Sequence, residues 1–92
     1  MVRIRDLRRR IRQLLRGPAN VDPKELVRLA LSVGRMPAKR GKEPTFVLEG
    51  TTRLPLTIPA HRRIGKYTVI DILRFLLDDL DYLERQQTTG SD

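Results

Sequence analysis

The chain has 92 residues, a formal net charge of +8, one histidine and no cysteine. Its length predicts a single small domain. Disulfides and thiolate metal sites are excluded, and one histidine is too few for a His-rich metal site. No apolar run approaches the ~18 residues of a membrane span, and no apolar core region of a secretory signal follows the basic N-terminus. We therefore expect a soluble cytoplasmic protein with neither a cofactor nor a membrane partner.

The positive charge is unevenly distributed along the chain. Residues 1–16 carry seven arginines and one aspartate, and residues 17–48 and 49–66 each carry a further +3. Residues 67–92 reverse the sign, with two arginines against six acidic residues. Clustered arginine and lysine bind phosphate directly, so the distribution predicts a nucleic-acid partner for the basic part of the chain.

Residues 1–16 have the pattern of an amphipathic helix. Apolar residues recur at spacings of three and four, and arginines cover the other face, which is typical of a helix with one buried side. Gly17 and Pro18 end it. The helix either packs on the domain with a solvated arginine face or serves as a basic arm for nucleic acid, and the two roles are compatible. A membrane-surface helix is disfavoured because the apolar face is narrow and lacks aromatic residues.

A short linker, residues 17–21, leads to a second helix. Asp22 is a good N-cap residue, and Pro23 suits the first helical position. We expect this helix to run to about Val33 and to be closed by Gly34.

Residues 35–59 predict a small antiparallel sheet. The segment 35–44 is basic and broken by prolines, which confine any strand there to a sheet edge. Residues 45–49 form a better strand, and residues 50–53 a turn. Residues 54–59 alternate apolar and polar side chains and pair back as a hairpin.

The last helix is expected to begin with Thr68 as its cap and to run from Val69 to about Gln87. It is apolar over more than half of its circumference, so it must be covered on two sides. The sheet covers one side, and the N-terminal helix or a second copy of the chain covers the other, which makes a homodimer through residues 69–87 possible. Five acidic residues of this helix are expected to face the arginines of residues 3–16: Asp71, Asp78, Asp79, Asp81 and Glu84. Residues 88–92 are a polar, flexible tail.

The predicted fold class is α+β, with a two- to three-stranded antiparallel sheet packed by helices and an extra basic helix at the N-terminus. Residues 22–87 form the core domain. This core resembles the HicA toxin family in the order of its motifs, which are Gly34, Arg40-Gly41, Ile58-Pro59-Ala60-His61, Gly65 and Thr68. The resemblance implies an α-β-β-β-α fold like that of the double-stranded-RNA-binding domain. It also implies a messenger-RNA-cleaving toxin with a HicB-like antitoxin as its partner.

One departure from the family pattern concerns catalysis. The family places its catalytic histidine in a Gly-Ser-His step, and the matching residues here are Gly41, Lys42 and Glu43. Histidine titrates near neutral pH unaided, whereas Glu43 lies among lysines that favour its ionised form. The substitute candidates for catalysis are Glu43 and His61, although the favoured role of His61 is local hydrogen bonding that shapes its loop. The sequence thus favours RNA binding with nuclease activity in doubt, and an active ribonuclease using a substitute residue is the alternative.

Two basic clusters flank the hairpin and are the predicted nucleic-acid-binding residues: Lys39, Arg40, Lys42, Arg62, Arg63 and Lys66. The alternative interpretation is that these basic residues are simply a solvent-exposed surface without a binding role. Because the four aromatic residues are few and scattered, base stacking is not expected. Contact with phosphates, weakly sequence-specific and strongly salt-dependent, is the predicted mode. A second alternative is a protein–protein interaction module in which charge only steers association.

Overall fold

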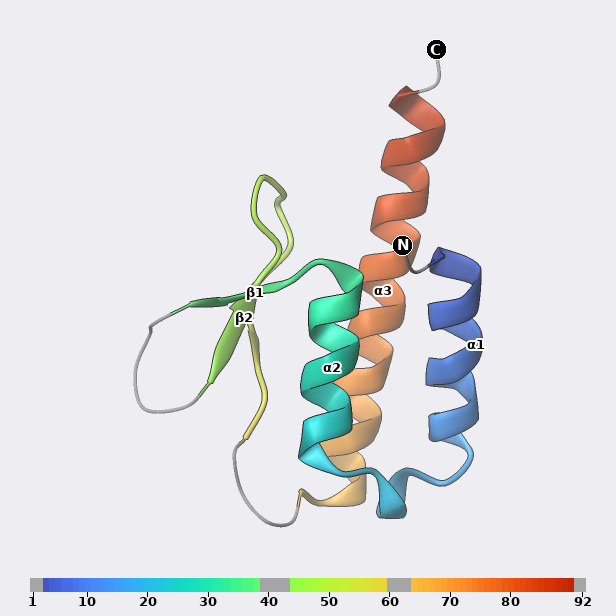
Figure 1. The fold of residues 1–92 in the computed structure, drawn as a ribbon, viewed down its shortest axis with the longest axis vertical. Coiled ribbons are helices and arrows are strands. Elements are labelled where there is room, and N and C mark those ends of the chain that lie inside the picture. Colours follow the sequence, from blue (N-terminus) through green and yellow to red (C-terminus); the bar gives the residue numbers. More distant parts are fainter. Residues whose placement is uncertain (1–2, 39–43, 60–63, 91–92) are drawn as a thin grey trace.

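The computed structural model describes residues 3–38, 44–59 and 64–90 and shows an α+β protein, which confirms the predicted fold class (Figure 1). Three α-helices and a three-stranded antiparallel sheet make up this part of the chain. In chain order the elements are α1 (Ile4–Leu15), the short 3₁₀ helix η1 (Pro18–Asn20), α2 (Pro23–Val33), β1 (Met36–Ala38), β2 (Thr45–Val47), β3 (Leu56–Thr57) and α3 (Lys66–Gly90).

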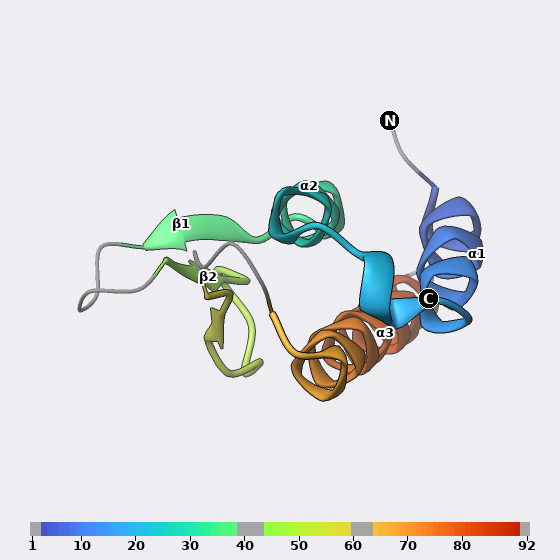
Figure 2. The same cartoon turned by 90° about the horizontal axis from the view of Figure 1, so that it is seen from below.

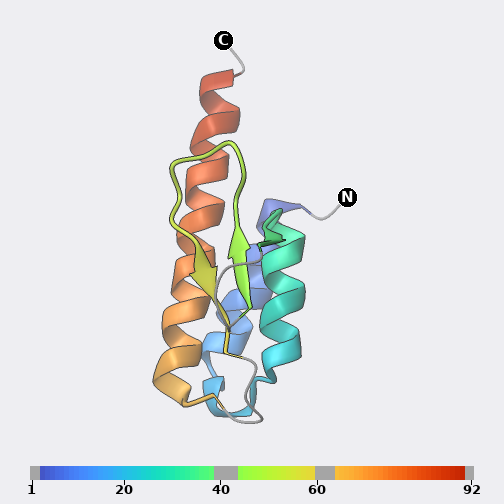
Figure 3. The same ribbon diagram turned by 90° about the vertical axis from the view of Figure 1, so that its left-hand side faces the viewer.

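The elements are arranged in three layers. Viewed from below, the sheet lies at one end of the molecule, α2 and α3 lie side by side in the middle, and α1 lies at the opposite end (Figure 2). The side view shows the sheet lying across α2 and α3 (Figure 3). The extra N-terminal helix is therefore part of the packed domain, on the far side of the central helices from the sheet.

Helix α2 begins and ends where its sequence predicts. The Asp22 carboxylate accepts a hydrogen bond from the backbone N–H of Lys24 at 2.8 Å, and Pro23 occupies the first turn. Gly34 follows the helix with a φ of 114°, in the left-handed region that favours glycine. Its N–H closes the helix on the backbone carbonyl of Leu31, and β1 starts two residues later.

The sheet is smaller than its sequence predicts. Its order is β1-β2-β3, with Met36 opposite Val47 and Phe46 opposite Leu56. β1 lies at an edge, as its proline requires. The third strand spans only Leu56–Thr57 instead of residues 54–59, because the connection after β2 occupies residues 48–55 rather than a four-residue turn. That connection is held by its own hydrogen bonds, including one from the Thr51 hydroxyl to the Leu48 carbonyl at 2.6 Å.

Helix α3 begins at Lys66, so the prediction that Thr68 caps it is wrong. The backbone N–H of Val69 already donates to the carbonyl of Gly65 at 3.0 Å, which places Thr68 inside the first turn. Thr68 and Asp71 are both exposed. The helix continues to Gly90, past Gln87, where the sequence predicts the start of a tail.

One hydrophobic core joins all three helices to the sheet. The apolar stripe of α3 is completely buried at Val69, Leu73, Leu76 and Leu80. Leu7 and Ile11 of α1 belong to the same cluster, together with side chains from α2, β2 and β3. The stripe is thus covered within one chain, and a second copy is not needed to cover it. Within the ranges described, no helix is long and apolar enough to cross a membrane.

Candidate nucleic-acid interface

Most of the residues predicted to bind or cleave RNA lie outside the described residues. These are Lys39, Arg40, Lys42, Glu43, His61, Arg62 and Arg63. Lys66 is the exception, and it is the exposed first residue of α3. Its ammonium group lies 5.3 Å from the centre of the Tyr67 ring, a cation–π contact on the surface.

Helix α1 is fixed to the domain by one apolar side. Leu7 and Ile11 are buried, and Ile4, Leu14 and Leu15 pack partly buried against the same core. The side chains at these spacings share one face of a helix, which is why the remaining residues of α1 point outward. Packing also explains why a helix with so many like charges is stable. Burial of its apolar face offsets the stability that repulsion between its arginines removes.

Ion pairs of two arginines flank the buried side of α1 and fix the helix against both of its neighbours. Towards α3, the Arg8 guanidinium donates to Asp81 at 2.8 Å and to Glu84 at 3.4 Å. Towards α2, Arg10 pairs with Glu25. Desolvation lowers the pKa of Arg8, but its hydrogen bonds and Coulombic attraction to Glu84 and Asp81 outweigh this effect and raise the pKa above its ordinary value. Arg8 and Arg10 therefore serve to orient α1.

The outward side of α1 presents four exposed arginines, which we call the arginine row: Arg5, Arg9, Arg12 and Arg16. With Arg8 and Gln13 they line a hollow of about 450 Å³ on the surface of the helix. Within the part of the chain that the structure describes, no carboxylate forms an ion pair with any member of the row. Four guanidinium groups on one helix face have the chemistry that suits contact with a polyanion.

The acidic residues of α3 divide between two roles that the sequence does not separate. Asp81 and Glu84 face α1, as predicted, whereas Asp71 and Asp78 are exposed. The prediction that Asp79 faces the N-terminal arginines is wrong. Asp79 is completely buried on the opposite side of α3, towards the sheet.

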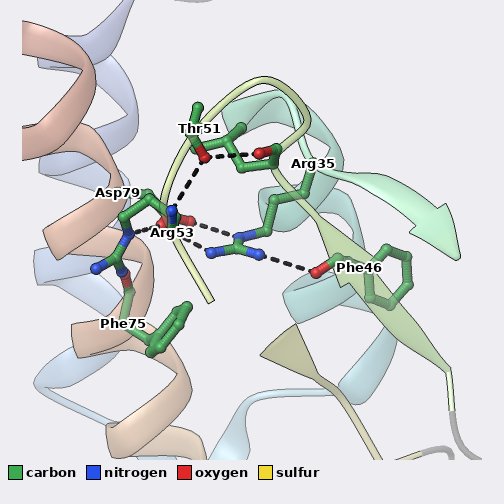
Figure 4. A network of polar contacts seen from close by, with 7 residues as sticks. Arg35, Phe46, Thr51, Arg53, Phe75 and Asp79 are labelled. Atoms are coloured by element: carbon green, nitrogen blue, oxygen red, sulfur yellow. Dashed lines mark hydrogen bonds and ion pairs between the residues drawn. The ribbon is translucent and has the colours of Figure 1, made fainter. Parts of the chain in front are cut away.

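A buried ion-pair network, which we call the Asp79 network, joins α3 to the sheet (Figure 4). Asp79 accepts hydrogen bonds from Arg35 Nε at 2.6 Å, Arg35 Nη2 at 2.8 Å and Arg53 Nε at 2.7 Å. Arg35 also donates to the backbone carbonyl of Phe46 at 2.8 Å, and Arg53 to that of Phe75 at 3.1 Å. Both guanidinium groups lie over the Phe75 ring, 5.0 and 4.5 Å from its centre.

The Asp79 network is a structural support. Arg35 and Asp79 have no exposed side-chain surface, and Arg53 is 20% exposed. The network ties the start of β1 and the connection between β2 and β3 to one turn of α3. One sequence signal for it exists, because Asp79 interrupts an otherwise apolar stripe between Leu76 and Leu80. A charged residue at such a position is buried only with a partner. No corresponding signal identifies Arg35 and Arg53 as the partners.

Across residues 3–38, 44–59 and 64–90, no group of three or more histidine, cysteine or acidic residues is arranged to hold a metal ion. The fold and site define a small α+β protein with an arginine-faced helix docked on its core. No family model matches the chain, and none of the curated proteins or solved structures matches it either.

Proposed function

We propose that this protein binds RNA through the phosphate backbone, with the arginine row as a contact surface. The observation that carries the proposal is the exposure of Arg5, Arg9, Arg12 and Arg16 on one side of a helix whose other side is fixed in the core. A fixed cationic surface releases counterions when it meets phosphates, which is the main source of affinity in sequence-independent binding.

The packing of α1 argues against the alternative of a membrane surface. An interfacial helix binds by burying its apolar side in the lipid. That side of α1 is already occupied, because Leu7 is 7% exposed and Ile11 is 0% exposed in the folded protein. The cationic side is the exposed one.

The choice of RNA over DNA, and of a toxin–antitoxin lineage with a HicB-like partner, rests on the HicA resemblance. We propose binding with nuclease activity in doubt, because Glu43 stands where the family pattern has its catalytic histidine and lies among lysines that favour its ionised form. The loop clusters around Lys39–Lys42 and Arg62–Lys66 are proposed as a further part of the contact surface on their sequence alone. The protein–protein alternative gains no support from α3, since its apolar stripe is buried within one chain.

The test measures binding of a labelled RNA stem-loop by fluorescence anisotropy over a range of salt concentrations. The variant Arg9→Gln/Arg12→Gln removes two cations from the arginine row. Arg28→Gln/Arg74→Gln is the matched control, since it removes the same charge from exposed positions on α2 and α3. Each phosphate contact releases ~0.7–0.9 counterion, so at ~0.15 M salt we expect the row variant to bind about 15- to 30-fold more weakly. The control should change the affinity only a few-fold.

Equal weakening by the two double variants would overturn the proposal, because it would show a response to net charge alone. Binding that ~0.5 M salt leaves unchanged would also overturn it, since the Debye length is then only a few ångströms. A third variant, Arg62→Ala/Arg63→Ala, measures the share of the predicted loop cluster. Duplex DNA as an unlabelled competitor tests the choice of nucleic acid, and preference for DNA would refute the choice of RNA.

A further inference from the structure

The arginine row is straight and is held in place along its whole length. Its members are spaced four, three and four residues apart, which amounts to about 16 Å from the first to the last at the rise of an α-helix. Leu7 and Ile11 fix the back of the same turns, and the ion pairs of Arg8 and Arg10 fix the rotation of the helix. The row therefore presents the backbone positions of its four arginines in one geometry before any ligand arrives.

A row of arginines with a fixed backbone should bind a ligand whose phosphates are already fixed in a line more tightly than a flexible one. A duplex holds its phosphates in fixed positions, so binding orders little except the arginine side chains. A single strand must give up its conformational freedom to place successive phosphates along the same line. Sites for single strands repay that cost by stacking bases on aromatic rings.

No such rings border the arginine row. Among the described residues, arginines and Gln13 line its hollow, and α1 carries no aromatic residue. Phe46 of β2 is buried in the core, and Phe75 is covered by the two arginines of the Asp79 network. Tyr67 and Tyr82 belong to α3 and do not line the hollow.

From these observations we infer that the arginine row binds the phosphate backbone of double-stranded RNA in preference to a single strand. The inference rests on the RNA-binding function proposed above and names the form of RNA that the row takes. Because the major groove of an A-form duplex is too deep and narrow for side chains to read, α1 lies along the outer edge of the backbone. Binding at the row is then independent of base sequence.

The experiment compares one labelled strand in two states. A uridine homopolymer is measured alone and after annealing to an equal amount of an adenosine homopolymer of the same length. Four phosphate contacts release more counterions from a duplex than from a single strand, and this difference alone makes duplex binding about fivefold tighter at ~0.15 M salt. The ordering cost of the single strand adds to that preference, so fivefold is the minimum expected.

The row variant Arg9→Gln/Arg12→Gln should weaken duplex binding about 30-fold at ~0.15 M salt and single-strand binding only about 15-fold, because each contact releases fewer counterions from a single strand. The control Arg28→Gln/Arg74→Gln should keep the preference for the duplex. Circular dichroism confirms that each variant is folded, as expected for exposed positions. Equal affinity for the two states, or equal weakening of both by the row variant, would refute the duplex preference and leave RNA binding standing. Binding to neither state by the unmodified protein would refute the proposed function itself.

Discussion

Replacement of Asp79 by asparagine tests the importance of the buried Asp79 network. The carboxylate accepts three hydrogen bonds from two guanidinium groups, and neither Asp79 nor Arg35 has exposed side-chain surface. In Asp79→Asn the neutral amide leaves the Arg35 charge buried without a counter-charge, and its NH₂ group faces other donors. Removal of one partner of a buried ion pair costs about 3–5 kcal/mol.

That cost is large for a chain of this length, whose total free energy of unfolding is expected to be about 5–14 kcal/mol. Urea denaturation followed by circular dichroism measures it, and the melting temperature should fall by ~12 °C or more. The matched control is Asp78→Asn, on the neighbouring residue of α3, where the side chain is exposed and a change within ~0.5 kcal/mol is expected. Equal effects of the two substitutions would refute the reasoning.

A second variant covers the case in which Asp79→Asn does not fold. Arg35→Met/Asp79→Leu replaces the buried pair by apolar side chains of similar size, and such replacements are often neutral or stabilising. We expect the double variant to be more stable than Asp79→Asn, since Arg53 is 20% exposed and can turn its charge towards water. A double variant as unstable as Asp79→Asn would mean that the packing around Phe75, and not the charge balance, carries the stability.

Three further substitutions test the local structure, each by urea denaturation. Asp22→Ala removes the cap hydrogen bond to Lys24 and should cost about 1 kcal/mol, whereas an unchanged midpoint would show that the cap is redundant. Gly34→Ala should cost about 1 kcal/mol or more because of backbone strain at its φ of 114°. A clash is not the cause, because the added Cβ would lie at an ordinary contact distance of 3.6 Å from Leu48. Ile11→Ala should cost about 2–5 kcal/mol, and a cost below this range would mean that α1 is only loosely docked.

Local sequence signals predicted the helices better than they predicted the sheet. Asp22 and Gly34 mark the ends of α2 correctly because capping depends on one side chain and its immediate backbone. Thr68 misled the assignment of the start of α3, because a suitable cap residue does not prevent the helix from starting one turn earlier. The predicted length of the third strand was too great, because the alternation at residues 54–59 does not show how many residues the preceding connection needs.

The candidate site was predictable only in part. The arginine face of residues 1–16 followed from periodicity, and so did its docking by the opposite face. Periodicity does not tell which arginines are used up in orienting the helix, because the partners of Arg8 lie more than seventy residues away in the sequence. The Asp79 network was missed for the same reason, since Arg35 and Asp79 meet only after the sheet has packed on α3.

The docking of α1 on α3 has a consequence for how the chain folds during its synthesis. Leu7 and Ile11 are made well before α3, yet the core that receives them includes Leu80 of that helix. Contacts over such sequence separations form late, because most of the chain must be closed into a loop first. The arginine-rich segment therefore leaves the ribosome without its apolar cover. It acquires a defined shape only when α3 is nearly complete, and the basic surface then forms together with the finished fold.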